Sequence, residues 1–371
     1  MVQINILVES NKDKDSSRSI LSKLFRNLMR INIIPLKWDE MNNQLNFKYF
    51  SKQFALYYLY VLAVSIFLLF CTCMFGFHKI LNFWKILLFE ENTTDMLTMI
   101  TFNIFGVSQY SFFPIFCRNL TKISKDIVMN YKLYWPCHGT KVAMMTILNL
   151  FALNIFSSLM YMHLLKTDIE SIAWLMLGII VSLLFNQLFQ FIMYIYILTW
   201  LDYFSKFCQN FDNENINKHV KNCIESYKSL QDGLQNTFLI CFSLLQVLTI
   251  INLYMAISSL FYGQTSIYTN ILMSICYFLM AMYNSTILYS VTTTAEKSYM
   301  ALQNLIIYLE QQLKLKQNSD ELMEIKILIR KIEHTCPLSG NGYFELKKGT
   351  ITSIVSISVT YLVILLQFRA S

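Results

Sequence analysis

The chain has 371 residues, of which 55% are hydrophobic and only 14% are charged, and its formal net charge is +7. The mean hydropathy is +0.43, whereas soluble domains carry about 25% charged residues. This composition excludes an ordinary soluble domain and indicates an integral membrane protein. The nine cysteines contain no CxxC pair and the five histidines do not cluster with them, so the sequence predicts neither a metal site nor a cofactor.

Seven apolar segments are long enough to cross a bilayer, for which a helix needs about 20 residues. These segments are residues 54–77, 95–117, 142–164, 171–200, 237–262, 267–292 and 350–368. None of them contains Lys or Arg in its interior. We therefore expect an all-α, integral membrane fold with seven transmembrane helices.

The basic residues between the spans predict the orientation of the chain. All but four of the 30 Lys and Arg lie in the N-terminal segment and in the second, fourth and sixth loops. Because Lys and Arg are enriched in cytoplasmic segments, this pattern places the N-terminus in the cytoplasm and, after seven spans, the C-terminus outside. Asn92 begins an Asn-Thr-Thr sequon in a loop predicted to be external, and is a glycosylation candidate.

The segments outside the spans contain amphipathic helices. Residues 20–31 have a basic amphipathic pattern, typical of a helix on the inner leaflet or docked on the bundle. Residues 294–315 and 320–335 each have one apolar face, so we expect them to pack into a cytoplasmic anchor. The predicted domains are the N-terminal segment 1–53, the six-span bundle 54–292, the anchor 293–349, and the last span with its external tail, 350–371.

The last span has a polar stripe. At about 100° per residue, one narrow sector holds Ser353, Ser356, Thr360, Ile364 and Gln367. Small hydroxylated side chains allow close packing of membrane helices. They would equally suit a helix that lines a pore, where hydroxyl oxygens and water stabilise ions. Because no intramembrane charge chain is present, conduction would require several copies of this helix around one axis.

The same span carries a family signature. Thr360-Tyr361-Leu362-Val363-Ile364-Leu365-Leu366-Gln367-Phe368 matches TYhhhhhQF, in which h is hydrophobic. This signature is typical of insect gustatory receptors, where it also lies in the seventh span. Gly342-Tyr343-Phe344-Glu345-Leu346 is similar to the aromatic-rich approach to that span in the same family. The chain resembles this family in motif, topology and length.

The resemblance implies a tastant-gated, nonselective cation channel in the plasma membrane of sensory neurons. It implies a homotetramer, or a heterotetramer with related receptors, in which the seventh helices line a central pore. Gln367 and Phe368 would form the extracellular gate, Tyr361 supports the motif, and the polar stripe would line the pore. The implied partners are a small-molecule tastant, permeating cations and membrane lipid, with no nucleic acid. No catalytic residue or cofactor is implied.

The ligand pocket is expected between the outer halves of spans two to six. Aromatic side chains with a few polar groups suit a sugar or an amphipathic bitter compound. Each residue has the alternative of an interfacial aromatic or an interhelical hydrogen bond. The ligand-binding candidates are Asp95, Thr98, Asn154, Tyr161, Trp174, Asn252, Tyr254 and Tyr268.

Other classes fit the sequence less well. A G-protein-coupled receptor has seven spans, but the charge pattern predicts the opposite orientation. A secondary transporter is expected to show repeated halves and charged or broken spans. An enzyme would need an acid–base pair, nucleophile or metal cluster at membrane depth, and no such constellation is evident. An odorant-receptor-type subunit of a heteromeric chemoreceptor channel shares the architecture and remains an alternative.

Overall fold

The computed structural model describes most of the C-terminal half of the chain and short pieces of the rest. The described residues are 37–39, 44–46, 52, 54–59, 62–63, 66–67, 117–118, 149, 193–194, 197–198, 200–209, 216–262, 267–315 and 319–370. The named elements are β1 (Lys37–Asp39), β2 (Gln44–Asn46), α7 (Ile216–Tyr262), α8 (Ile267–Leu315), α9 (Ser319–Glu333) and α10 (Lys348–Ala370).

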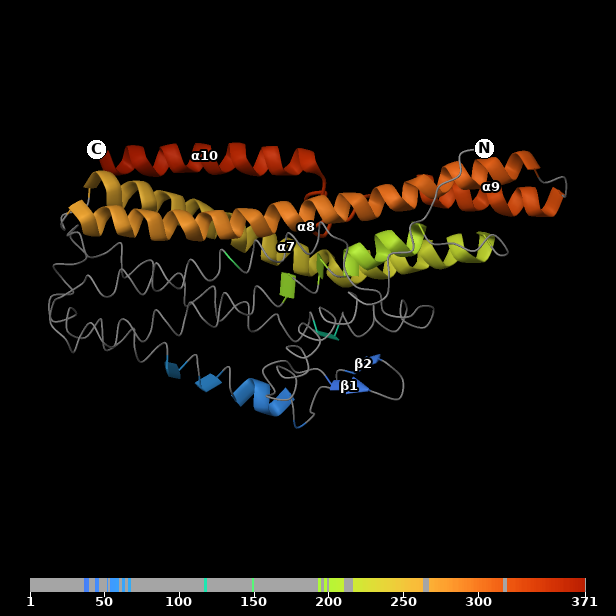
Figure 1. Cartoon of the computed structure of the whole chain (residues 1–371), viewed down its shortest axis with the longest axis horizontal. Helices are drawn as coiled ribbons and strands as arrows, with labels where there is room; N and C mark the ends of the chain where they lie inside the picture. The colour runs from blue at the N-terminus through green and yellow to red at the C-terminus, as the bar shows by residue number, and fades with distance from the viewer. Residues whose placement is uncertain are drawn as a thin grey trace, which may run out of the picture.

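Two long helices organise this part of the molecule (Figure 1). α7 has 47 residues and α8 has 49, so each is about 70 Å long. That is more than twice the roughly 30 Å of a bilayer's hydrocarbon core. Both helices are long and apolar enough to cross a membrane, and α10 contains a shorter apolar stretch, Lys348–Ile364. A membrane would cover only part of α7 and α8.

The charges divide the helix pair into two halves. Residues 237–262 of α7, 267–292 of α8 and 350–368 of α10 contain no charged side chain; we call them the uncharged half. Figure 1 shows α10 beside α7 and α8 at this end, and α9 beside α8 at the other. The 23 residues of α10 span about 35 Å, which matches one bilayer.

We call the other end, whose apolar core is continuous with that of the uncharged half, the charged half. It comprises the start of α7, the end of α8, α9 and the helical residues 200–209. Side chains from all of these elements belong to one continuous buried cluster. Asn217 donates a 3.0 Å hydrogen bond to Glu324 of α9, and Gln303 of α8 donates one of 3.2 Å to the Ile332 carbonyl. The predicted anchor helices therefore pack together, as their amphipathic patterns indicated.

The described residues are mostly helical, as the all-α prediction expected, with one short exception, β1 and β2, which pair antiparallel with Trp38 opposite Leu45. One prediction about secondary structure was wrong in detail. Residues 294–315 do not form a separate helix, because α8 runs unbroken from Ile267 to Leu315. The change from an apolar to an amphipathic pattern near 293 contains neither Gly nor Pro, so nothing in the backbone ends the helix there.

The helices predicted nearest the C-terminus are confirmed as helices. The predicted spans 237–262 and 267–292 lie within α7 and α8, and 350–368 lies within α10. α7 begins at Ile216, well before the predicted start of the fifth span. The amphipathic segment 20–31 and most of the first four spans lie outside the described residues. Seven spans and their orientation stay predictions.

Truncation of the α9 core tests the packing of the charged half. Ile325 is 0% exposed, whereas Ile327, two residues away on the same helix, is 47% exposed. Ile325→Ala should lower the stability of the charged half by about 2–5 kcal/mol through lost burial and an unfilled cavity. Ile327→Ala should change it by about 0.5 kcal/mol or less. Thermal melting of the detergent-purified chain measures both, and equal midpoints for the two variants would contradict this packing.

Candidate functional site

α10 is held to the rest of the described structure along one side only. Ser358 is 6% exposed and Ile351, Ile354 and Leu362, which follow the helical repeat on the same side, are partly buried. The remaining sides carry exposed apolar residues, among them Val355, Ile357, Val359, Tyr361 and Val363. A helix with so much exposed apolar surface needs lipid or further protein around it.

The polar stripe lies on these exposed sides. Ser353, Ser356, Thr360, Ile364 and Gln367 are all exposed. Ser353 donates a 3.3 Å hydrogen bond to the Gly349 carbonyl, and Thr360 donates one of 2.9 Å to the Ser356 carbonyl. These bonds use the hydroxyl proton within the helix and leave the oxygen lone pairs free as acceptors. Such a surface suits cations or water better than anions.

A small hairpin precedes α10. Its residues, 338–346, are closed by a hydrogen bond of 2.7 Å from the Leu346 amide to the Leu338 carbonyl and one of 2.9 Å from Gly340 to Phe344. Leu338 and Leu346 are both buried, at 1% exposure. The Phe344 ring lies 5.8 Å from that of Phe242, so the hairpin is fixed against α7.

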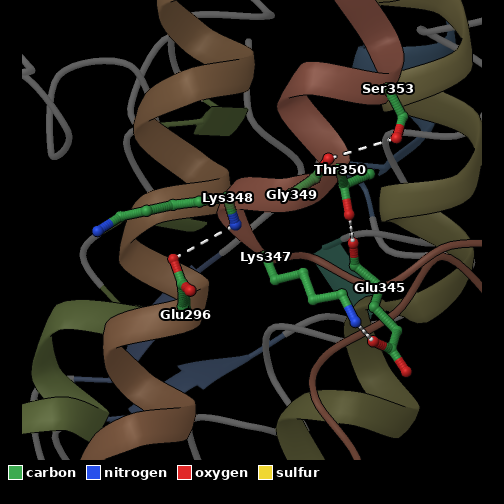
Figure 2. A network of polar contacts seen from close by, with 7 residues as sticks. All are labelled: Glu296, Glu345, Lys347, Lys348, Gly349, Thr350 and Ser353. Atoms are coloured by element: carbon green, nitrogen blue, oxygen red, sulfur yellow. Dashed lines mark hydrogen bonds and ion pairs between the residues drawn. The ribbon is translucent and has the colours of Figure 1, made fainter.

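Polar contacts join this hairpin to the start of α10 and to α8 (Figure 2). Glu296 of α8 accepts a 3.3 Å hydrogen bond from the Lys348 amide, one of the amides that a helix N-terminus leaves without an internal partner. Thr350 donates a 2.5 Å bond to the Glu345 carbonyl, and Lys347 pairs with the Glu345 carboxylate. The hydrogen bond to Glu345 raises the pKa of Lys347, which is exposed. The negative carboxylate of Glu296 also lies at the positive end of the α10 dipole, where it stabilises the helix.

The ligand-binding candidates are only partly described. Asn92, Asp95, Thr98, Asn154, Tyr161 and Trp174 lie outside the described residues. Tyr254 is half-buried, whereas Tyr268, at the start of α8, is 79% exposed. Asn252 is 1% exposed, and its Oδ1 accepts no hydrogen bond from the residues that the structure describes. A buried, unpaired amide oxygen costs about 1–3 kcal/mol, so Asn252 is the described candidate best suited to accept a hydrogen bond from a ligand or water.

The gate candidates lie near the end of α10. Gln367 is exposed, while for Phe368 the structure describes only the helical backbone. No group of three or more His, Cys, Asp and Glu that would suit a metal ion occurs among the described residues. The assignment of Gln367 and Phe368 to a gate stays a prediction.

Comparison with known proteins identifies the fold. No protein-family model and no curated protein matches the sequence. Among solved structures, the insect olfactory receptor OR5 from Machilis hrabei in complex with eugenol is similar with a TM-score of 0.57 at 13% identity, covering 94% of this chain and 99% of that chain. A second structure of OR5 gives a TM-score of 0.54 at 16% identity, with the same coverage.

The chain has the fold of an insect olfactory receptor. Both neighbours are receptors, not enzymes. The insect chemoreceptor fold expected from the TYhhhhhQF signature is therefore confirmed, whereas its gustatory branch is not. The near-complete coverage of both chains means that the insect chemoreceptor fold includes the charged half as well as the uncharged half.

The contacts of Glu296 were not foreseen from the sequence. Glu296 is one of several charged residues after the sixth predicted span, and no motif pairs it with Lys348, 52 positions away. The only available signal was its place as the first carboxylate after the uncharged part of α8. Its contact with Lys348 depends on the packing that brings α8 beside the start of α10.

Two glycines near the start of α10 provide a matched test of the hairpin. A Cβ on Gly340 would lie 2.4 Å from the Phe344 ring, whereas one on Gly349 meets nothing within 4 Å. Gly340→Ala should displace Phe344 and destabilise the hairpin by about 1–3 kcal/mol through overpacking. Gly349→Ala should be neutral or slightly stabilising, since Ala favours a helix by up to about 1 kcal/mol over Gly.

Hydrogen–deuterium exchange of residues 338–350 measures this difference. Exchange should speed up in Gly340→Ala and stay at the wild-type rate in Gly349→Ala. If both variants exchange like the wild type, Phe344 does not occupy the position described above.

Proposed function

We propose that this chain is a subunit of a chemoreceptor channel that a small molecule opens to cations. The observation that carries the proposal is the olfactory-receptor fold over 94% of the chain. The exposed polar stripe on α10 supports conduction, because its hydroxyl oxygens face outward as acceptors. Gln367 and Phe368, near the end of the same helix, are the proposed gate.

The exposed surface of α10 supports the proposal of an oligomer. Its exposed surface is both polar, at Ser356 and Thr360, and apolar, at Val355, Val359 and Val363. A single chain would expose the polar stripe to lipid, which offers no hydrogen-bond partners. Several copies around one axis place the stripe towards water and the apolar flanks against neighbouring subunits. A tetramer, homomeric or heteromeric, follows from the family resemblance and is part of the proposal.

The ligand class has two candidates. Both structural neighbours are olfactory receptors, and one of them is described in complex with eugenol. They support the odorant-receptor-type subunit better than the tastant-gated channel. The match of Thr360–Phe368 to the gustatory signature favours a sugar or bitter tastant. Asn252, with its unpaired buried oxygen, is the proposed polar contact for either ligand. The plasma membrane of sensory neurons is the proposed location.

Whole-cell recording tests this function and separates the two ligand classes. Cells would express the chain alone or with a related receptor, and receive volatile aromatics including eugenol, then sugars and bitter compounds. We expect a cation current that persists when G-protein signalling is blocked. Volatile agonists would assign the odorant type and nonvolatile ones the gustatory type. A response that depends wholly on G proteins would refute the channel.

Cysteine substitution tests the pore surface of α10. Ser356 is exposed, whereas Ser358, two residues further, is 6% exposed and faces the bundle. In Ser356→Cys, a positively charged methanethiosulfonate should react with the open channel and block most of the agonist current. Ser358→Cys should be insensitive to the same reagent. Equal sensitivity of the two variants would show that the stripe does not face the ion path.

A further inference from the structure

Charged side chains gather where the uncharged part of α10 begins (Figure 2). Between Lys348 and Arg369, α10 contains no charged residue. Next to its first turn lie the carboxylates of Glu345 and Glu296 and the ammonium groups of Lys347 and Lys348. Figure 2 shows Lys347 directed towards Glu345, whereas Lys348 points the other way. These two negative and two positive charges cancel at neutral pH.

The hairpin before α10 directs Glu345 outward. Phe344 packs against α7 and Leu346 is 1% exposed, so both neighbours of Glu345 point into the protein. Because alternate residues of an extended segment point to opposite sides, the Glu345 side chain stays outside, with 43% of its surface exposed. Its backbone carbonyl accepts hydrogen bonds from the Lys347 amide, at 3.1 Å, and from the Thr350 hydroxyl. The carboxylate is therefore held beside the first turn of α10.

The polar stripe of α10 begins at the same level. At about 100° per residue, Gly349 lies in the sector of Ser353 and Thr360. Its carbonyl accepts the Ser353 hydroxyl at 3.3 Å. Gly349 is exposed, and a Cβ on it would meet nothing within 4 Å. A cation that moves along the stripe towards this end thus passes an open position and then reaches the Lys347–Glu345 pair.

This end of α10 is expected on the cytoplasmic side, because the positive-inside pattern places the C-terminus outside. In the proposed oligomer, each charge at the start of α10 is repeated once per subunit around the ion path. Fixed charges of one sign at the entrance of a narrow path change the local concentration of cations there. An unpaired lysine in every subunit would repel cations, and an unpaired carboxylate would attract them.

We propose that the Lys347–Glu345 pair lies at the cytoplasmic mouth of the ion path and determines how fast cations enter it. This inference rests on the proposed channel function and names the residues that control its conductance. Glu345 cancels the charge of Lys347, so that the basic residue next to the helix does not repel cations. Lys347 in turn prevents the carboxylate from holding cations at the mouth. Neither residue needs to touch the gate at the opposite end of α10.

Single-channel recording from inside-out patches tests the pair. Channels would be opened with eugenol, sucrose or quinine, whichever activates the wild-type chain. In about 0.15 M salt, Glu345→Gln should lower the outward unitary conductance about twofold, and Lys347→Gln should raise it about twofold. The double variant should return to the wild-type value. In about 1 M salt all four conductances should agree, because a Debye length of about 3 Å screens the charges.

The opposite signs separate an electrostatic role from a structural one. If the pair merely stabilised the hairpin, either single substitution would break it, and both would change the conductance in the same direction. Glu310→Gln and Lys314→Gln are matched controls, at exposed charges of α8 that lie about 20 Å along the helix from Glu296. They should leave the conductance unchanged. Surface biotinylation checks that each variant reaches the membrane; if Glu345→Gln does not, Lys347→Gln alone decides.

The outcomes distinguish this inference from the proposed function. An agonist-evoked cation current with wild-type conductance in Lys347→Gln would overturn the inference and leave the channel standing. Shifts of the same sign in the two single variants, or shifts that persist in about 1 M salt, would overturn it as well. If none of the three compounds evokes a cation current from chains at the cell surface, the proposed function and the inference are refuted together.

Discussion

The length of α7 and α8 is the constraint on which the rest of the structure depends. Each helix is about 70 Å long, so it extends well beyond the hydrocarbon core of a bilayer, which is about 30 Å thick. The surplus must pack in water, and it does so by placing apolar faces of α9 and residues 200–209 against it. The charged half is therefore a direct continuation of the uncharged half, without a flexible linker in either long helix.

α10 differs from the other helices because the described structure supports it on one side and at its start. Its first turn is held by the Glu296 carboxylate and by the hairpin 338–346, which packs on Phe242. A movement of α8 would act on the beginning of α10 through these contacts.

The bounds of α10 were predictable because a helix that contacts lipid or protein along its length has an unbroken run of hydrophobic residues. The predicted span 350–368 lies within two residues of the observed bounds at each end. The helix boundary predicted near residue 293 was wrong. A change from an apolar to an amphipathic pattern does not end a helix unless a residue such as Pro interrupts it. The contact of Glu296 with Lys348 depends on how two helices distant in sequence are aligned. No periodicity within one segment contains that information.

α8 contacts residues 200–209, α9 and α10, and so connects these three parts of the structure. Within eight residues it donates from Ser298 to residues 200–209 and from Gln303 to α9, and it accepts at Glu296 from α10. Because α8 is one unbroken helix, a displacement of its uncharged part would reach all three contacts together.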